Sequence, residues 1–440
     1  MKKPKLSFWQ IWNLSFGFLG VQIGYSLQNS NTSSIFESLG ADVSHLSYFW
    51  LAAPVAGMII QPLVGLFSDG TWTRLGRRVP YILGGAVVST VALALMPNSP
   101  TLLTFAPLVV GALILLFMDL SFNVTMQPFR ALVADMLDDS QKTQGYVVQT
   151  FLINLGAVVG AVLPLLMTLC GVSDEAPAGQ VPDHIAYSYY IGGAILLLTV
   201  LVTACRAREY PPEEFARYNA IAEPAAERPG FAALLRNVPP AMLRLGVTQF
   251  FSWAALFLMW TYLKPAITGV VTDHATGELL STGATQTWVG VLNGIYPVPA
   301  CIAALFLGRV AARWGNRPVY VVTLLCGAAG FAGLWMLRDQ YALMVPMIGI
   351  GIAWAGILAM PYAILSLAVE PRHMGVYMGI FNFTVVIPQI VIGLTGGAIV
   401  TLCFAGDARS MLLLAAVFML LAALSAVWTA KSPAAKSEAQ

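Results

Sequence analysis

Long apolar runs separated by short polar segments make up most of the chain between residues 8 and 430. A helix needs about 20 apolar residues to cross roughly 30 Å of hydrocarbon, and runs of that length predict twelve membrane-spanning helices. We expect them near 8–30, 46–67, 79–96, 102–134, 143–170, 185–205, 240–263, 285–306, 318–337, 341–367, 374–404 and 409–430. The pattern therefore predicts an all-α integral membrane protein embedded in a lipid bilayer.

One segment interrupts the pattern. Residues 206–238 are rich in charge and proline and contain no apolar run of spanning length. They are typical of a cytoplasmic linker, and an amphipathic helix lying on the membrane is an alternative for part of them. We predict an N-terminal six-helix half at 1–205, the linker at 206–238, and a C-terminal six-helix half with a short cytoplasmic tail at 239–440.

The basic residues predict the orientation of the helices. The chain has 23 lysines and arginines, and basic residues of membrane proteins concentrate in cytoplasmic loops. If both termini are cytoplasmic, only Lys264, Arg338 and Arg409 fall outside. We therefore expect a protein of the plasma membrane, or the inner membrane of a bacterium, with both ends inside.

Composition excludes several classes of protein. Only 10% of the 440 residues are charged and 58% are hydrophobic, whereas about 25% of a soluble domain is charged. The net charge of +2 comes without a basic patch interleaved with aromatics, so we expect no nucleic-acid partner. The five cysteines and four histidines show no metal-ligand spacing, and no phosphate-binding glycine loop is present. We predict no metal, no cofactor, no ATP-driven pumping and no enzymatic activity.

The two predicted halves echo each other in sequence. Four identities between the loop at 74–81 and the loop at 313–320 share one constant offset: Arg74 with Arg313, Gly76 with Gly315, Arg78 with Arg317, and Tyr81 with Tyr320. In the fourth and tenth spans, Pro128-Phe129 resembles Pro361-Tyr362. A duplicated six-helix unit explains these matches most simply.

The fourth span carries a carboxylate, Asp119, near its middle. A charged side chain at that depth costs roughly 2.5–3.5 kcal/mol on insertion scales, so such residues are rare and usually functional. Taking up a proton removes most of that cost. We therefore predict that Asp119 faces a cavity between helices as the proton-coupling site, with a purely structural hydrogen bond between helices as the alternative.

Polar residues follow Asp119 along one helix face. Asn123, Gln127 and Arg130 lie four, eight and eleven residues later, and a polar stripe of this length cannot face lipid. We expect Asn123 and Gln127 to bind substrate. Arg130 is roughly 16 Å from Asp119 along a straight helix, so its partner is Asp135 or Asp69 at an inner gate, or a substrate oxygen.

Uncharged polar residues also mark the end of the first span. Gln22, Tyr25 and Asn29 repeat at helical spacing. Amides and phenols both donate and accept hydrogen bonds, which suits a neutral, hydroxyl-rich ligand. We expect these three residues to bind such a ligand, and hydrogen bonding between helices is the alternative.

The seventh span carries Gln249, Trp253, Phe257 and Trp260 on one face. Aromatic faces stack on the apolar faces of sugar rings, so Gln249 and Trp253 are candidate sugar ligands. Packing is the alternative for such a stripe, and Trp260 near the outer end suits an interface anchor. Weaker candidates for substrate binding are Asn293, Tyr296, Trp354, Asn382 and Gln389.

The first inner loop resembles the signature of the major facilitator superfamily. It reads Gly65-Leu66-Phe67-Ser68-Asp69 and then Arg74-Leu75-Gly76-Arg77-Arg78, with a long spacing similar to that of sucrose transporters and of glycoside–pentoside–hexuronide cation symporters. The fourth span also resembles plant-type sucrose–proton symporters, in the register of Asp119, Asn123, Pro128, Arg130-Ala131-Leu132 and Ala134-Asp135. Gly70 and Val79 depart from the sucrose group, which often has arginine there.

Charges in this loop are suited to gating. Arg74, Arg77 and Arg78 with Asp69 at the inner face can lock two helices together in one conformation and release them in another. Arg130 and Asp135 join this set through the resemblance. The alternative role of the arginines is to fix the topology of the loop.

The resemblance implies a major facilitator fold with twelve helices in two pseudo-symmetric halves, and a proton-coupled symporter. Its partners would be the proton and a neutral disaccharide such as sucrose, maltose or a related glucoside, imported by alternating access with sites near the midplane between the halves. A monomer suffices because one chain supplies both halves. Alternatives are sodium-coupled uptake of a pentoside or uronide, export of an amphipathic drug, and a non-transporting membrane assembly factor.

Overall fold

The computed structural model describes residues 3–39, 46–102, 106–177, 179–219 and 230–429, which form helices joined by short connections. The chain divides into two compact units. Unit 1 contains Met1–Arg236 and Glu370–Asn382, and unit 2 contains Asn237–Val369 and Phe383–Gln440. Thus one short segment from late in the sequence belongs to the unit that the early sequence builds.

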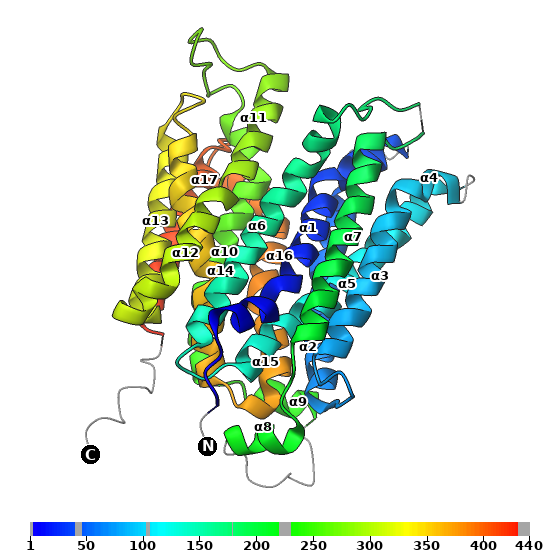
Figure 1. Ribbon diagram of the computed structural model, residues 1–440. Helices are drawn as coiled ribbons and strands as arrows, with labels where there is room; N and C mark the ends of the chain where they lie inside the picture. Colours follow the sequence, from blue (N-terminus) through cyan, green and yellow to red (C-terminus); the bar gives the residue numbers. More distant parts are fainter. Residues whose placement is uncertain (1–2, 40–45, 103–105, 178, 220–229, 430–440) are drawn as a thin grey trace. The chain divides into compact units, whose positions relative to one another are not determined.

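Six long helices form most of unit 1: α1 (Phe8–Ser38), α2 (Leu46–Gly70), α3 (Val79–Leu95), α5 (Pro107–Met136), α6 (Lys142–Leu169) and α7 (Asp183–Arg206). The short elements are η2 (Met96–Asn98), α4 (Ser99–Leu102), α8 (Pro212–Tyr218), α9 (Phe231–Arg236), η3 (Pro371–His373) and α15 (Met374–Phe381). α1 packs against α6 and α7 (Figure 1). Gly156 of α6 allows this approach, because a Cβ there would lie 2.5 Å from the carbonyl oxygen of Leu19.

Unit 2 contains α10 (Pro240–Ile267), α11 (Thr282–Ile295), α12 (Pro297–Trp314), α13 (Asn316–Met336), α14 (Met344–Ala368), α16 (Phe383–Ala398), the π-helix η4 (Ile399–Cys403) and α17 (Ser410–Val427). α13 packs closely on α14 and α17, and α10 packs on α17. A Cβ on Gly330 of α13 would lie 2.7 Å from the carbonyl oxygen of Pro346, so glycine again lets two backbones meet.

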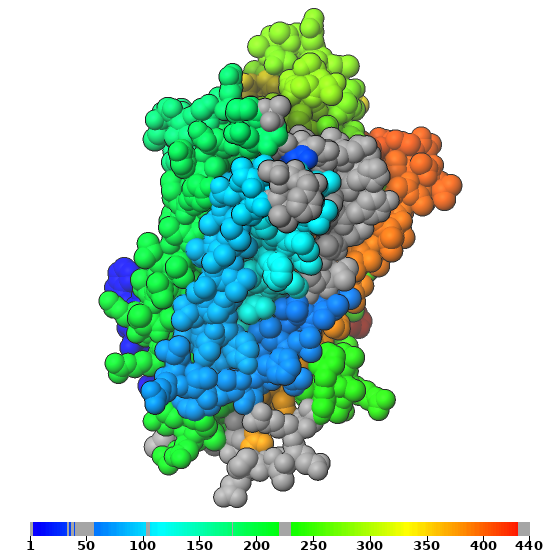
Figure 2. Space-filling model, turned by 90° about the vertical axis from the view of Figure 1, so that its right-hand side faces the viewer, coloured from blue at the N-terminus to red at the C-terminus, as the bar shows by residue number. Residues whose placement is uncertain are grey.

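The surface of these helices suits a bilayer. Ten helical stretches in the described part of the chain are long and apolar enough to cross a membrane, and α1 and α2 are long helices at the first two predicted positions. Figure 2 shows the face on which α3 lies beside α7. Exposed apolar side chains on these two helices include Val87, Val91 and Leu198. The predicted all-α membrane fold is confirmed.

The duplicated loops share a glycine with positive φ. Gly76 joins α2 to α3 and Gly315 joins α12 to α13, with φ of 107° and 83° respectively, in the region that favours glycine. Pro128 and Pro361, the second pair of the sequence echo, lie inside α5 and α14. Two predicted spans are interrupted: the eighth at Tyr296 between α11 and α12, and the eleventh at Asn382 between α15 and α16.

The predicted linker contains two short helices, and its described residues up to Arg236 belong to unit 1. α8 and α9 lie within 206–238, and residues 220–229 are outside the described residues. The compact units therefore divide the chain after residue 236, near the end of the predicted linker. They also assign Glu370–Asn382 to the first unit, which the sequence pattern does not indicate.

Candidate functional site

Asp119 lies in the middle of α5 with only 2% of its surface exposed. Its carboxylate faces α1, where Gln28 Nε2 donates a hydrogen bond of 2.5 Å to Oδ1. No lysine or arginine among the described residues forms an ion pair with it. Asp119 is therefore a buried acid held by a neutral donor, and it points neither at lipid nor at a balancing cation.

A chain of amides continues from Asp119 to α2. The side chain of Asn123 donates to the backbone oxygen of Asp119 at 2.7 Å, and Gln61 Nε2 donates to Asn123 Oδ1 at 2.6 Å. Oε1 of both Gln28 and Gln61 is buried without a hydrogen-bond partner within the described structure. A buried acceptor without a partner costs about 1–3 kcal/mol, so these oxygens are suited to a hydroxyl donor from a ligand.

The other candidates on α1 differ in depth. Tyr25 is half-buried, and its ring meets Phe122 of α5 edge-on with centroids 5.8 Å apart. Gln22 is half-buried and Asn29 is exposed. The predicted polar face of α1 is therefore partly accessible, but the α1 side chain that holds Asp119 is Gln28.

The two remaining candidates on the α5 stripe diverge from Asp119. The buried amide of Gln127 donates to the backbone oxygen of Gly375 on α15. Arg130 is half-buried, and its backbone oxygen accepts from the hydroxyl of Tyr146 at 3.0 Å. The inner end of the stripe thus contributes to packing between helices, whereas its middle carries the acid.

Unit 2 contains an aromatic cluster that we call the tryptophan cluster: Trp253, Trp260, Tyr296 and Trp354. The ring of Trp354 lies 5.4 Å from Trp253, 5.9 Å from Trp260 and 6.1 Å from Tyr296, all edge to face. Gln249 is fully buried one turn before Trp253. Gln249 Nε2 and Trp253 Nε1 are buried donors with no acceptor in the described part of the chain.

The weaker candidates of unit 2 and its neighbouring segment are less concentrated. Asn293 is half-buried, and its Oδ1 has no partner among the residues described. Gln389 donates to the backbone oxygen of Val385 in its own helix at 3.1 Å. Asn382 is buried and lies in unit 1 at the end of α15.

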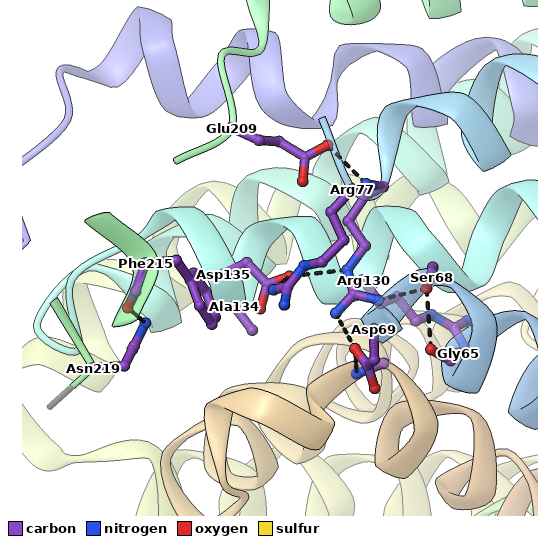
Figure 3. A network of polar contacts seen from close by, with 12 residues as sticks. Gly65, Ser68, Asp69, Arg77, Arg130, Ala134, Asp135, Glu209, Phe215 and Asn219 are labelled. Carbon is purple, nitrogen blue, oxygen red and sulfur yellow. Dashed lines mark hydrogen bonds and ion pairs between the residues drawn. The ribbon is translucent and has the colours of Figure 1, made fainter. Parts of the chain in front are cut away.

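A second polar centre lies where α2, α3 and α5 of unit 1 meet, and we call it the arginine network. Arg78 is fully buried. It donates to Ser68 Oγ at 2.5 Å, to Asp69, and through Nε to Asp135 Oδ2 at 2.9 Å. Arg77 Nη2 lies 2.6 Å from the same oxygen of Asp135. Figure 3 shows Asp69 and Asp135 at the centre of these contacts, so the two carboxylates bind Arg77 and Arg78.

The arginine network also holds α15. The two carboxylate oxygens of Asp69 accept from the backbone nitrogens of Gly375 at 3.0 Å and Val376 at 2.9 Å. These are orphan donors in the first turn of the helix, where negative charge is favourable. Gly65 and Gly379 permit the contact, because a Cβ on either would meet backbone atoms of the opposite helix within 2.5 Å. Asp69 therefore ties a segment of the late sequence to unit 1.

The linker completes the arginine network. Glu209 Oε1 accepts from the backbone nitrogens of Arg78 at 2.8 Å and Val79 at 3.0 Å, at the start of α3. The ring of Phe215 on α8 lies 4.2 Å from Arg77 Cζ, which is a cation–π distance. Burial raises the pKa of Glu209, although the two backbone donors oppose the change. Arg74, by contrast, is exposed.

Comparison with known families decides what kind of protein carries these sites. A family model described as "MFS/sugar transport protein" matches residues 35–374. The chain belongs to the MFS/sugar transport family. It is a membrane transporter and not an enzyme, as the sequence predicts.

Curated relatives of this transporter include sucrose transporters. It is 24% identical to "Sucrose transport protein SUT5" of Oryza sativa over 431 residues, covering 86% of this chain and 80% of the relative. It is 23% identical to "Sucrose transport protein SUC4" of Arabidopsis thaliana, covering 86% and 81%. It is 25% identical to the "General alpha-glucoside permease" of Schizosaccharomyces pombe, covering 60% of this chain and 48% of the relative.

Solved structures show that the transporter has the major facilitator fold. It matches the E. coli fucose:proton symporter FucP with a TM-score of 0.70 at 14% identity, covering 96% and 98% of the two chains. It matches the proton:xylose symporter XylE with a TM-score of 0.71 at 11% identity, covering 94% of each. The predicted fold class is therefore confirmed.

Several residues of these sites are absent from the sequence-based predictions. Gln28 and Gln61 are polar residues in apolar helices, but spacing alone does not show which neighbour they contact. Glu209 and Phe215 lie in a segment expected to be only a linker, and its length gives no sign of docking. Tyr320 binds Gln249, and its place in the repeated loop is the only signal that singles it out.

Proposed function

We propose that the transporter is a proton-coupled symporter that imports a neutral disaccharide, such as sucrose, maltose or a related glucoside, by alternating access. The observation that carries the proposal is Asp119, a carboxylate buried within a membrane-spanning helix and held by Gln28. A group in this setting has a strong reason to exchange a proton, because charge in an apolar environment is costly.

In the proposed cycle Asp119 takes up a proton from outside together with the sugar and releases it inside after the sugar leaves. Gln28 donates to the carboxylate of Asp119, and Asn123 donates to its backbone oxygen. Burial would couple the two events, because a bound sugar excludes water from the site and a neutral carboxylic acid is much less costly to desolvate than a charged carboxylate. One acid in this position favours one proton per cycle.

The polar groups beside Asp119 and in the tryptophan cluster favour an uncharged sugar. The unpaired atoms of Gln28, Gln61, Gln249 and Trp253 all belong to neutral side chains. Amides and indoles pair with hydroxyl and ring oxygens, and indole rings offer flat surfaces for the C–H faces of a sugar. The relatives named for sucrose and α-glucoside transport support a glucoside.

We further propose that the arginine network is the inner gate. Asp69 joins Arg78 to the first turn of α15, so a conformational change that withdraws α15 would have to break these hydrogen bonds. Arg77, Asp135 and Arg130 would act in the same region, and Arg74 at its exposed edge. A lock of this type stabilises one state of a two-state transporter.

The proposed location is the plasma membrane, or the inner membrane of a bacterium, with both termini in the cytoplasm and the monomer as the working unit. The basic residues support this orientation, because Arg74, Arg77 and Arg78 fall in one inner loop. Tagging each terminus and testing its access to protease in sealed cells checks the orientation. Cleavage of either tag from outside would contradict it.

The function is tested by uptake of labelled sucrose and maltose into proteoliposomes with an inward proton gradient. The unmodified transporter should accumulate one or both sugars, and collapse of the gradient should abolish accumulation. Asp119→Asn should still equilibrate sugar but should not accumulate it, because asparagine cannot release a proton. Asp174→Asn, which changes an exposed acid, is the matched control.

Three outcomes would contradict the proposal. If accumulation follows a sodium gradient and not a proton gradient, the coupling ion is wrong. If a pentoside or uronide is accumulated and disaccharides are not, the substrate class is wrong. If Asp119→Asn accumulates sugar like the unmodified protein, the carboxylate has no coupling role.

A further inference from the structure

The amide of Gln249 in α10 has a fixed orientation. Its Oε1 accepts a hydrogen bond of 2.8 Å from the hydroxyl of Tyr320 on α13, and Ser252 Oγ lies 3.5 Å from the same oxygen. Both Gln249 and Tyr320 are fully buried. Since Oε1 is bound, Nε2 is left as a donor, and it has no acceptor within the described structure.

A second unpaired donor lies one helical turn further along α10. Trp253 follows Gln249 by four residues, so the two side chains share a helix face. Trp253 is 9% exposed and its Nε1 also lacks an acceptor among the described residues. Two buried donors on one face, beside the rings of Trp354 and Trp260, form a site that an oxygen-rich ligand with an apolar face would complete.

We propose that unit 2 contains a subsite for a glucopyranosyl ring, and that Tyr320 is the positioning residue that aims Gln249 Nε2 at it. The inference rests on the proposed function and deepens it. Ring and hydroxyl oxygens of the sugar accept from Gln249 and Trp253, while its C–H face lies on the indoles of the tryptophan cluster. A glucosyl ring has its hydroxyls equatorial and presents flat C–H faces, whereas the axial hydroxyl of a galactosyl ring interrupts one face.

Tyr320 differs from its counterpart in the first repeat. Tyr81 shares a hydrogen bond of 2.8 Å with Thr71, a residue near the surface. The hydroxyl of Tyr320 instead donates to Oε1 of the buried Gln249, whose Nε2 has no acceptor within the described structure. If Tyr320 acts only through packing, phenylalanine replaces it without loss of binding. If Tyr320 instead orients the amide of Gln249, removal of its hydroxyl lets that amide rotate. Oε1 of Gln249 can then face the sugar oxygens, which need a donor and not a second acceptor.

The test is a double-mutant cycle on sugar binding by the purified full-length protein, measured by calorimetry with sucrose and maltose. Tyr320→Phe should weaken binding of the transported disaccharide about fivefold to tenfold, the scale of one net hydrogen bond. Gln249→Ala should weaken it at least as much. In the Gln249→Ala background Tyr320→Phe should have no further effect, because the group that it positions is gone.

Gln249→Met guards against misfolding as an explanation. It keeps the length of the side chain, removes the free donor and adds no charge to the buried position. Thermal unfolding should therefore show a folded protein that has lost sugar binding. Tyr81→Phe is the matched control and should bind sugar like the unmodified protein. In transport, Tyr320→Phe should raise KM and leave the maximal rate and the proton dependence of accumulation unchanged.

Additive losses in the cycle, full binding by Tyr320→Phe or Gln249→Met, or equal affinity for glucosides and the matching galactosides would each overturn the subsite. These results are distinct from a failure of the proposed function. In that case the unmodified protein itself would neither bind nor accumulate sucrose or maltose. Retained transport with an additive cycle would reject the subsite alone.

Discussion

Arg78 and Arg317 occupy matching places in the two copies of one loop, but they differ in burial and in ion pairing. Arg78 is fully buried between Asp69 and Asp135. Arg317 is half-buried and forms no ion pair with a described residue. A buried arginine needs carboxylates to offset its desolvation, and α2 and α5 supply them around the first copy alone. The two loops share this arginine, but the neighbouring helices decide whether it is buried in ion pairs.

For the tyrosines of the same loops, the more buried side chain is the one in the second copy. Tyr81 pairs with Thr71 near the surface, whereas Tyr320 is buried against Gln249. The first repeat has thus developed an ionic centre and the second a neutral one.

The largest expected effect separates the two arginines. Arg78→Met should destabilise the protein by about 3–5 kcal/mol, because Asp69 loses its cationic partner and Asp135 keeps only Arg77. Arg317→Met should change stability little. Thermal unfolding of both variants in the same detergent measures the difference, and equal losses would show that the two loops are energetically equivalent.

A smaller effect is expected where the arginine network meets α15. Asp69→Asn keeps the shape but removes the charge that accepts from Gly375 and Val376. Hydrogen bonds to a charged group are worth about 1.5–3 kcal/mol, so backbone hydrogen exchange in residues 374–381 should accelerate about tenfold or more. Exchange in α13 of unit 2 serves as the internal reference. Unchanged protection of α15 would show that Asp69 does not hold it.

The neutral centre should respond in sugar affinity more than in stability. Trp253→Phe keeps a ring but removes the unpaired indole donor, so disaccharide binding should weaken about threefold to tenfold. Trp288→Phe is the matched control, since its Nε1 is also unpaired within the described residues but its ring packs on Tyr341, away from the tryptophan cluster. Calorimetric titration compares the two, and equal affinities would remove Trp253 from the subsite.

The smallest effect concerns pH and the linker. Burial raises the pKa of Glu209 above its ordinary 4.5, so the folded state binds this proton more tightly than the unfolded state does. The resulting stabilisation is present below pH 4.5 and is lost as pH rises through the folded-state pKa. Glu209→Gln should therefore gain stability relative to the unmodified protein as pH rises from 4 to 8. Unfolding temperatures across that range that move in the opposite direction would contradict this sign.

The sequence predicts the helices well because a bilayer imposes length and polarity on every span. It also singles out Asp119 as a carboxylate within a membrane-spanning helix, since an acidic residue in an apolar run is conspicuous. It does not predict Gln28 as the partner, because the rotation of α1 against α5 depends on packing across two helices. Periodicity suggests Gln22, Tyr25 and Asn29, but only the folded arrangement shows that Gln28 is the residue of α1 that binds the acid.

The inner end shows the same limit. Asp69, Arg77, Arg78 and Asp135 are a natural charge set, but the choice of partners follows from their positions. The expectation that Asp69 or Asp135 pairs with Arg130 arises from helical spacing, whereas the structure gives both carboxylates to Arg77 and Arg78. Docking of α15 on α2 depends on glycines that meet across helices, and no local pattern encodes that contact.

The most direct measurement of the central claim is proton movement driven by sugar alone. Sucrose or maltose is added to weakly buffered proteoliposomes without any imposed gradient, and the external pH is followed. Sugar entry should make the external medium more alkaline with the unmodified protein and should leave its pH unchanged with Asp119→Asn, although that variant still binds sugar. A pH change of equal size in both proteins would contradict the assignment of Asp119 as the proton carrier.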